Sequence, residues 1–398
     1  MKVQFGDLKS HYVTYKEQLD QAVSRVLESG YFILGPELKA FEESFAEFLG
    51  YKESEPFVVG CGSGTDAIYL ALAAGGVGPG DEVIAPSHTA VPTICAIRMT
   101  GATPVFVDIC PETQLIDPAQ IEAKITDKTR AIVPVHLYGQ MADMEAICSL
   151  AEKHNLFVVE DCAQSTGATQ KGKQSGTIGE FGAFSFYPSK NLGAFGDAGA
   201  VSCKTRESYE RLVKLRNYGQ SKRYYNDIEG VNSRLDEMQA AILAVQLPFV
   251  AQWNKRRQEI ASRYDAGLKS VLPVPEVARN NEHVYHLYVI QTDQREALMD
   301  FLNERSVQTL IHYPVPAHRQ DAYNYLNYQK GSLPATEHAV ERILSLPMYP
   351  GLTDDQVDFV IESICEFFKS GKCETPKPSK EQNLDVDRKP DQVASSVS

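Results

Sequence analysis

The chain has 398 residues, of which 43% are hydrophobic and 23% charged, and its formal net charge is -13. This length is sufficient for a large core and for about two domains. The acidic balance excludes an extended nucleic-acid surface, because phosphate backbones are bound by clustered Lys and Arg. The eight cysteines form no CxxC pair, so the sequence predicts neither a zinc site nor a disulfide framework. We find no membrane-spanning run and no secretory signal, and therefore expect a cytoplasmic protein.

Strand-like and helix-like segments alternate over the first three-fifths of the chain. The strand-like runs are apolar and occupy residues 57–60, 82–86, 103–108, 130–136 and 156–161. Helical patterns such as "GTDAIYLALAAGG" and "DMEAICSLAEKHN" lie between them. This alternation predicts an α/β fold with a mainly parallel sheet and helices on both faces. In such sheets, ligands bind beyond the carboxyl ends of the strands.

The remaining sequence predicts a long interrupted helix and then a smaller mixed region. The helical pattern begins near Asn232, and Pro248 is expected to bend or break it. A strand-like run, "HVYHLYVIQT", then precedes a helix-like segment and a final helix near residues 354–368. From these patterns and from composition we predict a large domain over 1–250, a smaller α/β domain over 251–369 and a disordered polar tail over 370–398.

A glycine-rich turn follows the first strand-like run. The sequence "VVGCGSGTDAI" places glycines, Ser63 and Thr65 at a helix start, where backbone N–H groups are free to bind an anion such as a phosphate. Two other interpretations stay open from these residues alone: a tight turn that requires glycine, and the glycine loop of a methyltransferase. A methyltransferase loop would have an acidic residue where this chain has Val58 and Val59.

A carboxylate and a lysine follow downstream of that turn. Asp161 ends the apolar run "VVED", and Lys190 lies among glycines in "FSFYPSKNLGAFGDAGAV". A lone Asp at such a position is explained by capping of a turn or helix. A carboxylate, a lysine and a phosphate-binding turn together are the parts that a protein supplies to pyridoxal phosphate. The glycines around Lys190 leave room for a bulky ligand to approach the backbone.

The order of these motifs resembles that of a known family, the DegT/DnrJ/EryC1/StrS sugar aminotransferases. The resemblance covers roughly residues 3–368 and rests on "GYFILGPELKAFEESFAEFLG", "GSGTDAI", "GVGPGDEVIAPSHT", "EDCAQSTGA", "FSFYPSKNLGAFGDAGAV", "LRNYGQ" and "GVNSRLDEMQAAIL". It implies the aspartate aminotransferase-like fold (fold type I) with pyridoxal phosphate as cofactor. It also implies homodimers with shared active sites, L-glutamate as amino donor and a nucleotide-linked keto sugar as acceptor.

The resemblance assigns roles to particular residues. Lys190 would bind the cofactor covalently and move the proton in catalysis, Asp161 would pair with the pyridine nitrogen, and Gln164 would contact the side of the ring hydroxyl. The phosphate would be held by Gly64, Thr65 and Ser185, with Asn232 reaching it from the partner subunit. Members that carry out dehydration have histidine in place of the lysine, so Lys190 favours transamination over dehydration.

Substrate contacts and one departure from the family pattern complete the predicted site. The segment "TLIHYPVP" resembles members that aminate a dTDP-linked 3-keto-6-deoxyhexose, and the predicted substrate-binding residues are Tyr31, Tyr218, His312 and Tyr313. The family commonly stacks an aromatic side chain on the ring at the position of Ala90, so we predict that His88 replaces it. Amination of a 4-keto sugar and a non-catalytic, ligand-binding or regulatory role on the same fold remain as alternatives.

Overall fold

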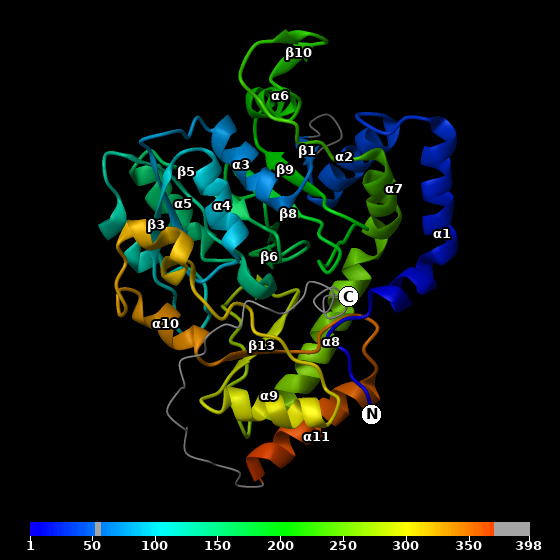
Figure 1. Cartoon of the computed structure of the whole chain (residues 1–398), viewed down its shortest axis with the longest axis vertical. Coiled ribbons are helices and arrows are strands. Elements are labelled where there is room, and N and C mark those ends of the chain that lie inside the picture. Colours follow the sequence, from blue (N-terminus) through cyan, green and yellow to red (C-terminus); the bar gives the residue numbers. More distant parts are fainter. Residues whose placement is uncertain (52–56, 370–398) are drawn as a thin grey trace.

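The computed structural model describes residues 1–51 and 57–369, and its elements alternate between strands and helices (Figure 1). The helices are α1 (Leu8–Ser29), α2 (Pro36–Phe48), α3 (Gly64–Ala74), α4 (Val91–Met99), α5 (Met144–Lys153), α6 (Arg206–Leu215), α7 (Glu237–Gln246), α8 (Val250–Leu268), α9 (Arg295–Glu304), α10 (Pro334–Val340) and α11 (Asp354–Lys369). The strands are β1 (Val58–Cys61), β2 (Glu82–Pro86), β3 (Thr103–Val107), β4 (Thr129–Ile132), β5 (Phe157–Asp161), β6 (Thr169–Gln170), β7 (Lys173–Gln174), β8 (Phe181–Ser185), β9 (Gly199–Cys203), β10 (Gln220–Lys222), β11 (Tyr225–Asn226), β12 (Asn281–Glu282), β13 (Tyr288–Gln291) and β14 (Ile343–Leu346).

A seven-stranded sheet in the order β1-β9-β8-β5-β4-β2-β3 forms the centre of the molecule. The run from β8 to β3 is parallel, whereas β9 is antiparallel to both β8 and β1. The apolar runs of the sequence are these strands, and the predicted α/β fold with a mainly parallel sheet is confirmed. Strands β5 and β8 are buried almost throughout, as expected for strands with helices on both faces. Because β2, β5 and β8 run in the same direction, their carboxyl ends meet at one edge, which carries the site.

The interrupted helix is found where the sequence predicts it. Helix α7 ends at Gln246, a short 3₁₀ turn covers Leu247–Phe249, and α8 starts directly afterwards. Pro248 lies in that turn because its ring and its missing N–H are incompatible with a continuous helix. In Figure 1, α8 runs from the sheet region down to the C-terminal elements.

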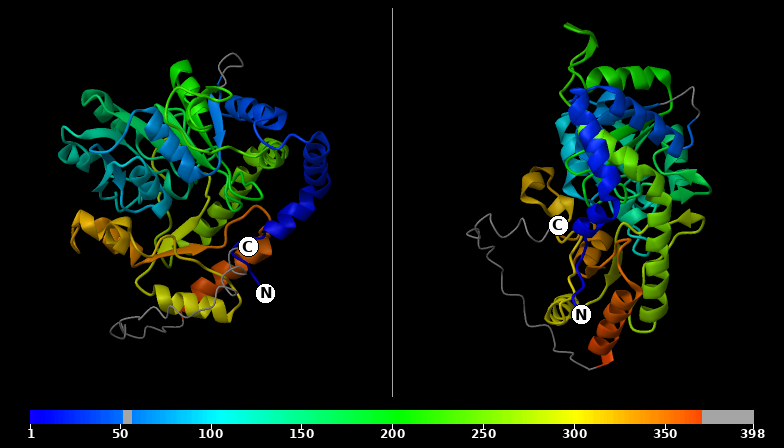
Figure 2. Two further views of the ribbon diagram at one scale, coloured as in Figure 1. Left: turned by 45° about the horizontal axis from the view of Figure 1, so that its top comes forward. Right: turned by 90° about the vertical axis from the view of Figure 1, so that its right-hand side faces the viewer.

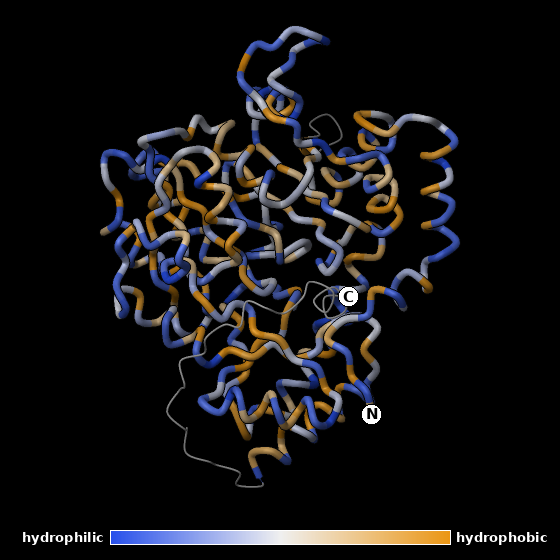
Figure 3. The backbone as a smooth tube through the Cα atoms, viewed as in Figure 1, coloured by the Kyte–Doolittle hydropathy of each residue, from blue (hydrophilic) through white to orange (hydrophobic). Residues whose placement is uncertain are grey.

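The C-terminal elements have a core of their own. Strands β13 and β14 pair antiparallel, and α8, α9 and α11 pack their apolar faces around them. The chain start joins this core, since Val3 is fully buried in it and bridges Val307. Both views of Figure 2 show α1 leading from there along the outside of the molecule. In Figure 3 the apolar segments lie mostly inside both regions, whereas α1 is largely polar on its outer side.

The segment before β14 does not belong wholly to the C-terminal core. Ala317, Tyr323 and Leu333 pack into the core that α3 and α4 form on the central sheet. The division at residue 250 into two domains stays a prediction, and the predicted tail, 370–398, lies outside the described residues. Over residues 1–51 and 57–369, we find no helix with the length and apolar composition needed to cross a bilayer.

Candidate functional site

Lys190 lies in the turn that follows β8, at the edge where the parallel strands end. Its backbone N–H donates to the Tyr187 carbonyl at 2.8 Å. The turn is tight, because a Cβ at Gly193 would lie 2.4 Å from the Pro188 carbonyl oxygen. Burial lowers the pKa of Lys190 to about 8, and the Asp161 carboxylate opposes part of that shift. The uncharged amine, which is the form that acts as a nucleophile, is therefore more populated near neutral pH than in an ordinary lysine.

Asp161 is the last residue of β5 and is 4% exposed. Its carboxylate accepts a hydrogen bond from the Thr93 hydroxyl at 2.7 Å and one from the Ala163 N–H at 3.1 Å. Burial nevertheless raises its pKa, against the opposing effects of these hydrogen bonds and of Lys190. This carboxylate has few charged partners for its degree of burial, and a protonated ring nitrogen would supply the missing cation.

The buried neighbours of Asp161 fix the end of β5. Glu160 accepts hydrogen bonds from the N–H groups of Gly176, Ile178 and Gly179 at 3.0, 2.7 and 2.6 Å. It also accepts the Nε2 proton of His136 at 2.8 Å, since Nδ1 of that ring accepts from the Ala142 N–H. Cys162 lies close enough to make His136, Glu160 and Cys162 a possible metal-ligand group by distance. The hydrogen bonds already occupy these nitrogen and carboxylate atoms, so the group holds the strand in place.

Gly64 and Thr65 begin α3, directly opposite Ser185. Ser63 caps this helix by accepting from the Asp66 N–H at 3.1 Å, which leaves the first N–H groups of the helix free for an anion. A Cβ at Gly64 would lie 2.5 Å from Cβ of Ser185, so only glycine fits. The structure thus brings Gly64, Thr65 and Ser185 together, and the arrangement fits a phosphate group.

Gln164 links the loop after β5 to the predicted substrate segment. Its side-chain oxygen accepts from the Tyr138 N–H at 2.6 Å, and its amide donates to the Tyr313 hydroxyl at 3.1 Å. The Tyr138 hydroxyl bonds Nε2 of His88 at 2.9 Å and donates to the His312 carbonyl. Gln164, His88, His312 and Tyr313 therefore belong to one connected network. The role of His88 as the ring-stacking residue stays a prediction.

His312 lies beside Lys190. Burial and the positive charge of Lys190 together lower the pKa of His312 to about 4. The ring stacks on Phe5, with centroids 5.6 Å apart, and Nδ1 bonds the Ser345 hydroxyl at 2.8 Å. His312 is consequently a neutral, oriented imidazole at the mouth of the lysine site.

The other predicted residues, Tyr31, Tyr218 and Asn232, lie on the surface, where Tyr31 is 63% and Tyr218 43% exposed. In the described parts of the chain, no hydrogen bond joins any of the three to Lys190 or Asp161. Asn232 is nonetheless close to the start of α3, because the hydroxyl of the adjacent Ser233 accepts from the Gly62 N–H at 3.0 Å. These three residues could therefore contact a ligand or a partner chain only at the surface of this chain.

Several residues with a direct part in this geometry are absent from the sequence-based prediction. Thr93 bonds Asp161, and Tyr138 connects Gln164 with His88 although its φ of 62° is in the left-handed region. Asn191 donates to Asn254 at 2.8 Å and accepts from His286 Nδ1 at 3.2 Å, which anchors the turn that carries Lys190. Their only signal in the sequence is proximity to a motif, as for Asn191 directly after Lys190.

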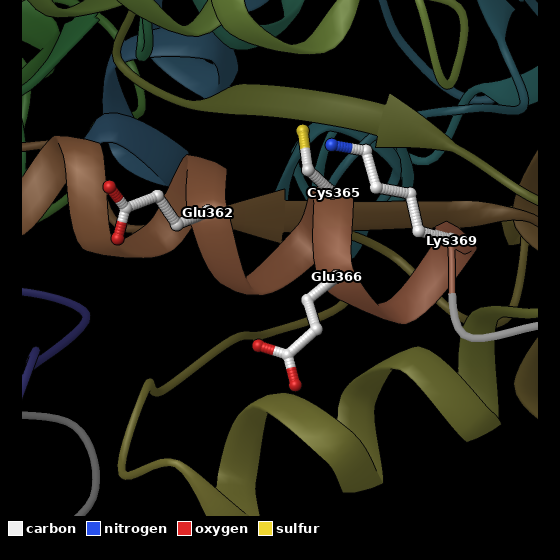
Figure 4. A pocket seen from close by; sticks show the side chains of 4 residues that line it. All are labelled: Glu362, Cys365, Glu366 and Lys369. Atoms are coloured by element: carbon white, nitrogen blue, oxygen red, sulfur yellow. The ribbon is translucent and has the colours of Figure 1, made fainter.

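Two hollows of different size bear on the site and its surroundings. The larger, with a volume of about 830 Å³, adjoins Lys190 and is bordered by the N-terminal segment and α8. The smaller is a shallow depression on α11 lined by Glu362, Cys365, Glu366 and Lys369 (Figure 4). Glu366 there accepts from Arg305, and helix α11 lies at the end of the molecule away from the central sheet (Figure 1).

Two known proteins are similar in sequence to this chain over nearly its whole length. A dTDP-3-amino-3,6-dideoxy-alpha-D-galactopyranose transaminase from Aneurinibacillus thermoaerophilus is 46% identical over 91% of this chain and 98% of its own length. A pleiotropic regulatory protein from Geobacillus stearothermophilus is 43% identical over 93% of this chain and 99% of its own.

Solved structures have a similar fold. DesV from Streptomyces venezuelae is 45% identical, with a TM-score of 0.89 over 92% of this chain and 99% of that chain. NtdA from Bacillus subtilis, solved with its cofactor PMP bound, is 34% identical, with a TM-score of 0.86 over 92% and 85% of the two chains. The cofactor is therefore pyridoxal phosphate, in agreement with the fit of Lys190, Asp161 and the α3 start. The model of the DegT/DnrJ/EryC1/StrS aminotransferase family matches residues 13–365, and the chain belongs to this family of enzymes.

Proposed function

We propose that this aminotransferase moves an amino group from L-glutamate to a dTDP-linked 3-keto-6-deoxyhexose in the biosynthesis of an amino sugar. The observation that carries the proposal is the position of the "IHYP" segment. The charge of Lys190 acts on His312, and the Tyr313 hydroxyl contacts Gln164. A keto sugar that reacts at Lys190 would thus meet polar groups from this segment, which resembles that of 3-keto-specific members.

When bound, pyridoxal phosphate supplies an electron sink for the carbon that bears the transferred nitrogen. We assign the chain's own groups as follows. Asp161 holds the ring nitrogen protonated, Gly64, Thr65 and Ser185 bind the phosphate, and Gln164 and His88 orient the ring. Lys190 would hold the cofactor covalently until a donor amine takes its place, and Lys190 would then lie beside the substrate carbon. Its lowered pKa makes the neutral amine more accessible than in an ordinary lysine, and that neutral form would accept the proton from the substrate carbon.

The donor would leave as 2-oxoglutarate with its amino nitrogen left on the cofactor, and the same residues would serve the keto sugar in the reverse direction. Water exclusion matters here because every charged contact at Asp161 and Lys190 strengthens as the dielectric constant falls. Glutamate as donor is supported by the family resemblance. The 3-position is supported by the 3-amino sugar made by the A. thermoaerophilus relative.

We further propose a homodimer with shared active sites. The cofactor phosphate is a dianion, and burying it requires donors on several sides. One chain supplies the α3 start and Ser185, while Asn232, exposed on the surface, is free to reach the site of a partner. Tyr31 and Tyr218, also exposed, would contact the nucleotide sugar bound in the partner's site.

A panel assay tests the proposal. The purified holoenzyme is incubated with L-glutamate and with dTDP-, UDP- and GDP-linked keto sugars that carry the ketone at position 3 or 4. We expect the cofactor absorbance to bleach with glutamate and the dTDP-3-keto sugar to be aminated fastest. Amination of 4-keto sugars alone would establish the 4-keto alternative, whereas sugar binding without amine transfer would establish the non-catalytic one.

A further inference from the structure

The cavity of about 830 Å³ next to Lys190 is distinct from the cofactor cradle. Its walls come from the first residues of the chain, from α8 and from the C-terminal region, and Lys190 with its turn forms one side. The cradle residues Gly64, Ser185 and Asp161 do not border it. The cavity thus meets the reaction site only at Lys190 and the neighbouring histidines.

A buried guanidinium lines this cavity. Arg257 is 5% exposed, and its Nη1 donates to the carbonyls of Tyr285, His286 and Met348 at 3.1, 3.3 and 2.9 Å. Its Nε is buried and has no hydrogen-bond partner. Burial lowers the pKa of Arg257 to about 10, so the group is still charged at neutral pH.

Arg257 has no counter-ion in the part of the chain that the structure describes. The three carbonyls that accept from it are dipoles and carry no net charge. Its charge reaches the cavity walls, because it is one of the causes that lower the pKa values of His11 and His286. An uncompensated buried cation is costly, and an anion in the same cavity would offset that cost.

The acidic groups on the cavity wall are engaged elsewhere. Asp7 caps α1 by accepting from the Ser10 N–H at 2.9 Å, and Glu259 pairs with Arg256 at 3.4 Å. His11 bonds Gln246 at 2.7 Å, and burial lowers its pKa, which favours the neutral ring. Among the described residues, Arg257 therefore remains an unpaired buried cation on the wall, beside Lys190, whose charge also lowers the pKa of His286.

We infer that this cavity binds a small carboxylate with Arg257 as its counter-ion. A guanidinium pairs with a carboxylate in a planar, charge-assisted arrangement. Two sources supply such a group: the amino donor or its oxo-acid product, entering beside Lys190, and a separate carboxylate metabolite that does not react. The first source rests on the proposed function, whereas the site itself does not.

The chain contains a built-in reporter for this test. Trp253 is the single tryptophan, borders the cavity from α8, and donates from Nε1 to the Tyr15 hydroxyl at 2.9 Å. The holoenzyme is titrated with glutarate, which has two carboxylates and no amine to transfer. We expect a saturable change in tryptophan fluorescence, and none with the neutral control 1,5-pentanediol.

Two variants identify the place of binding. Arg257→Lys keeps a cation but removes the planar fork, and we expect glutarate affinity to fall by about 10- to 100-fold. Thr14→Phe adds volume at an exposed position of the cavity wall and keeps Arg257, so it should weaken glutarate binding. This second variant tests the site even if Arg257→Lys does not fold. No saturable change in the wild type, or unchanged affinity in Thr14→Phe and in folded Arg257→Lys, would overturn the inference.

A competition arm separates the two sources. If glutarate competes with L-glutamate for bleaching of the cofactor absorbance, the carboxylate is that of the donor. If bleaching is unaffected while Trp253 reports bound glutarate, the site serves a separate carboxylate. Amine transfer without any change in tryptophan fluorescence on addition of glutarate would refute the carboxylate site and leave the proposed function standing. A glutarate signal without amine transfer to any keto sugar would refute the proposed function alone.

Discussion

The molecule presents its predicted functional residues in two very different ways. Lys190, Asp161 and the start of α3 are assembled within one chain at the strand ends, where Asp161 is buried and the other residues are partly buried. Tyr31, Tyr218 and Asn232 belong to equally recognisable motifs, yet they lie on the surface, and over the described residues no hydrogen bond joins them to Lys190. The difference teaches that a motif identifies a chemical role, whereas only packing shows whether one chain suffices to perform it.

The largest expected effect is at the buried centre. Lys190→Ala removes both the covalent attachment point and the proton carrier, so turnover should fall by more than about 10²- to 10⁴-fold, the contribution of a general base alone. Borohydride reduction of the wild-type holoenzyme followed by peptide mapping should label Lys190. A label on another lysine would refute the assignment.

Next in size is the effect of neutralising the carboxylate. Asp161→Asn cannot stabilise a protonated ring nitrogen, and a neighbouring charge shifts a pKa by about 1–3 units, so we expect a loss of about 10- to 1000-fold in kcat with cofactor still bound. Steady-state kinetics measure kcat, and the cofactor absorbance measures how much cofactor is bound. Near-wild-type turnover would contradict the role of Asp161.

Substitution of the surface residue Asn232 should cause a smaller loss of cofactor binding, and it can be tested by complementation between two variants. Asn232→Ala should weaken cofactor retention by about 10- to 100-fold, the value of one hydrogen bond to a charged group, and leave the fold intact. If Asn232 acts on the partner's site, mixing it with Lys190→Ala gives hybrid dimers with one intact site. An equal mixture should then regain about a quarter of wild-type activity. No recovery after verified subunit exchange would place Asn232 in its own chain's site.

The smallest effect concerns the titration of Lys190. The protonated amine is inert and the neutral amine is the nucleophile, so the rate at which cofactor-free protein binds pyridoxal phosphate should rise about tenfold per pH unit and level off near pH 8. An unperturbed lysine would continue to rise to about pH 10.4. Asp161 raises this pKa, so Asp161→Asn should move the plateau to lower pH. Stopped-flow absorbance across pH 6–10 measures both curves.

Much of the fold and of the buried site could be predicted because each rests on local sequence. Apolar runs specify the strands, Pro248 interrupts the helix, and glycines mark the turn at Gly64 where no Cβ fits. Residues such as Thr93, Tyr138 and Arg257 could not be predicted, since their roles arise from contacts between segments far apart in the chain. Arg257, for example, meets carbonyls of residues 28 to 91 positions away, which no local pattern encodes.

The central claim is that this chain carries an amine from glutamate to carbon 3 of a dTDP-linked keto sugar. Nitrogen-15-labelled L-glutamate and the holoenzyme, incubated with separate 3-keto and 4-keto dTDP-6-deoxyhexoses, test it most directly. We predict a labelled amine at carbon 3, detected by NMR correlation to the proton on that carbon, and none in the reaction with Lys190→Ala. Labelled amine only at carbon 4, or label retained entirely in glutamate, would contradict the account.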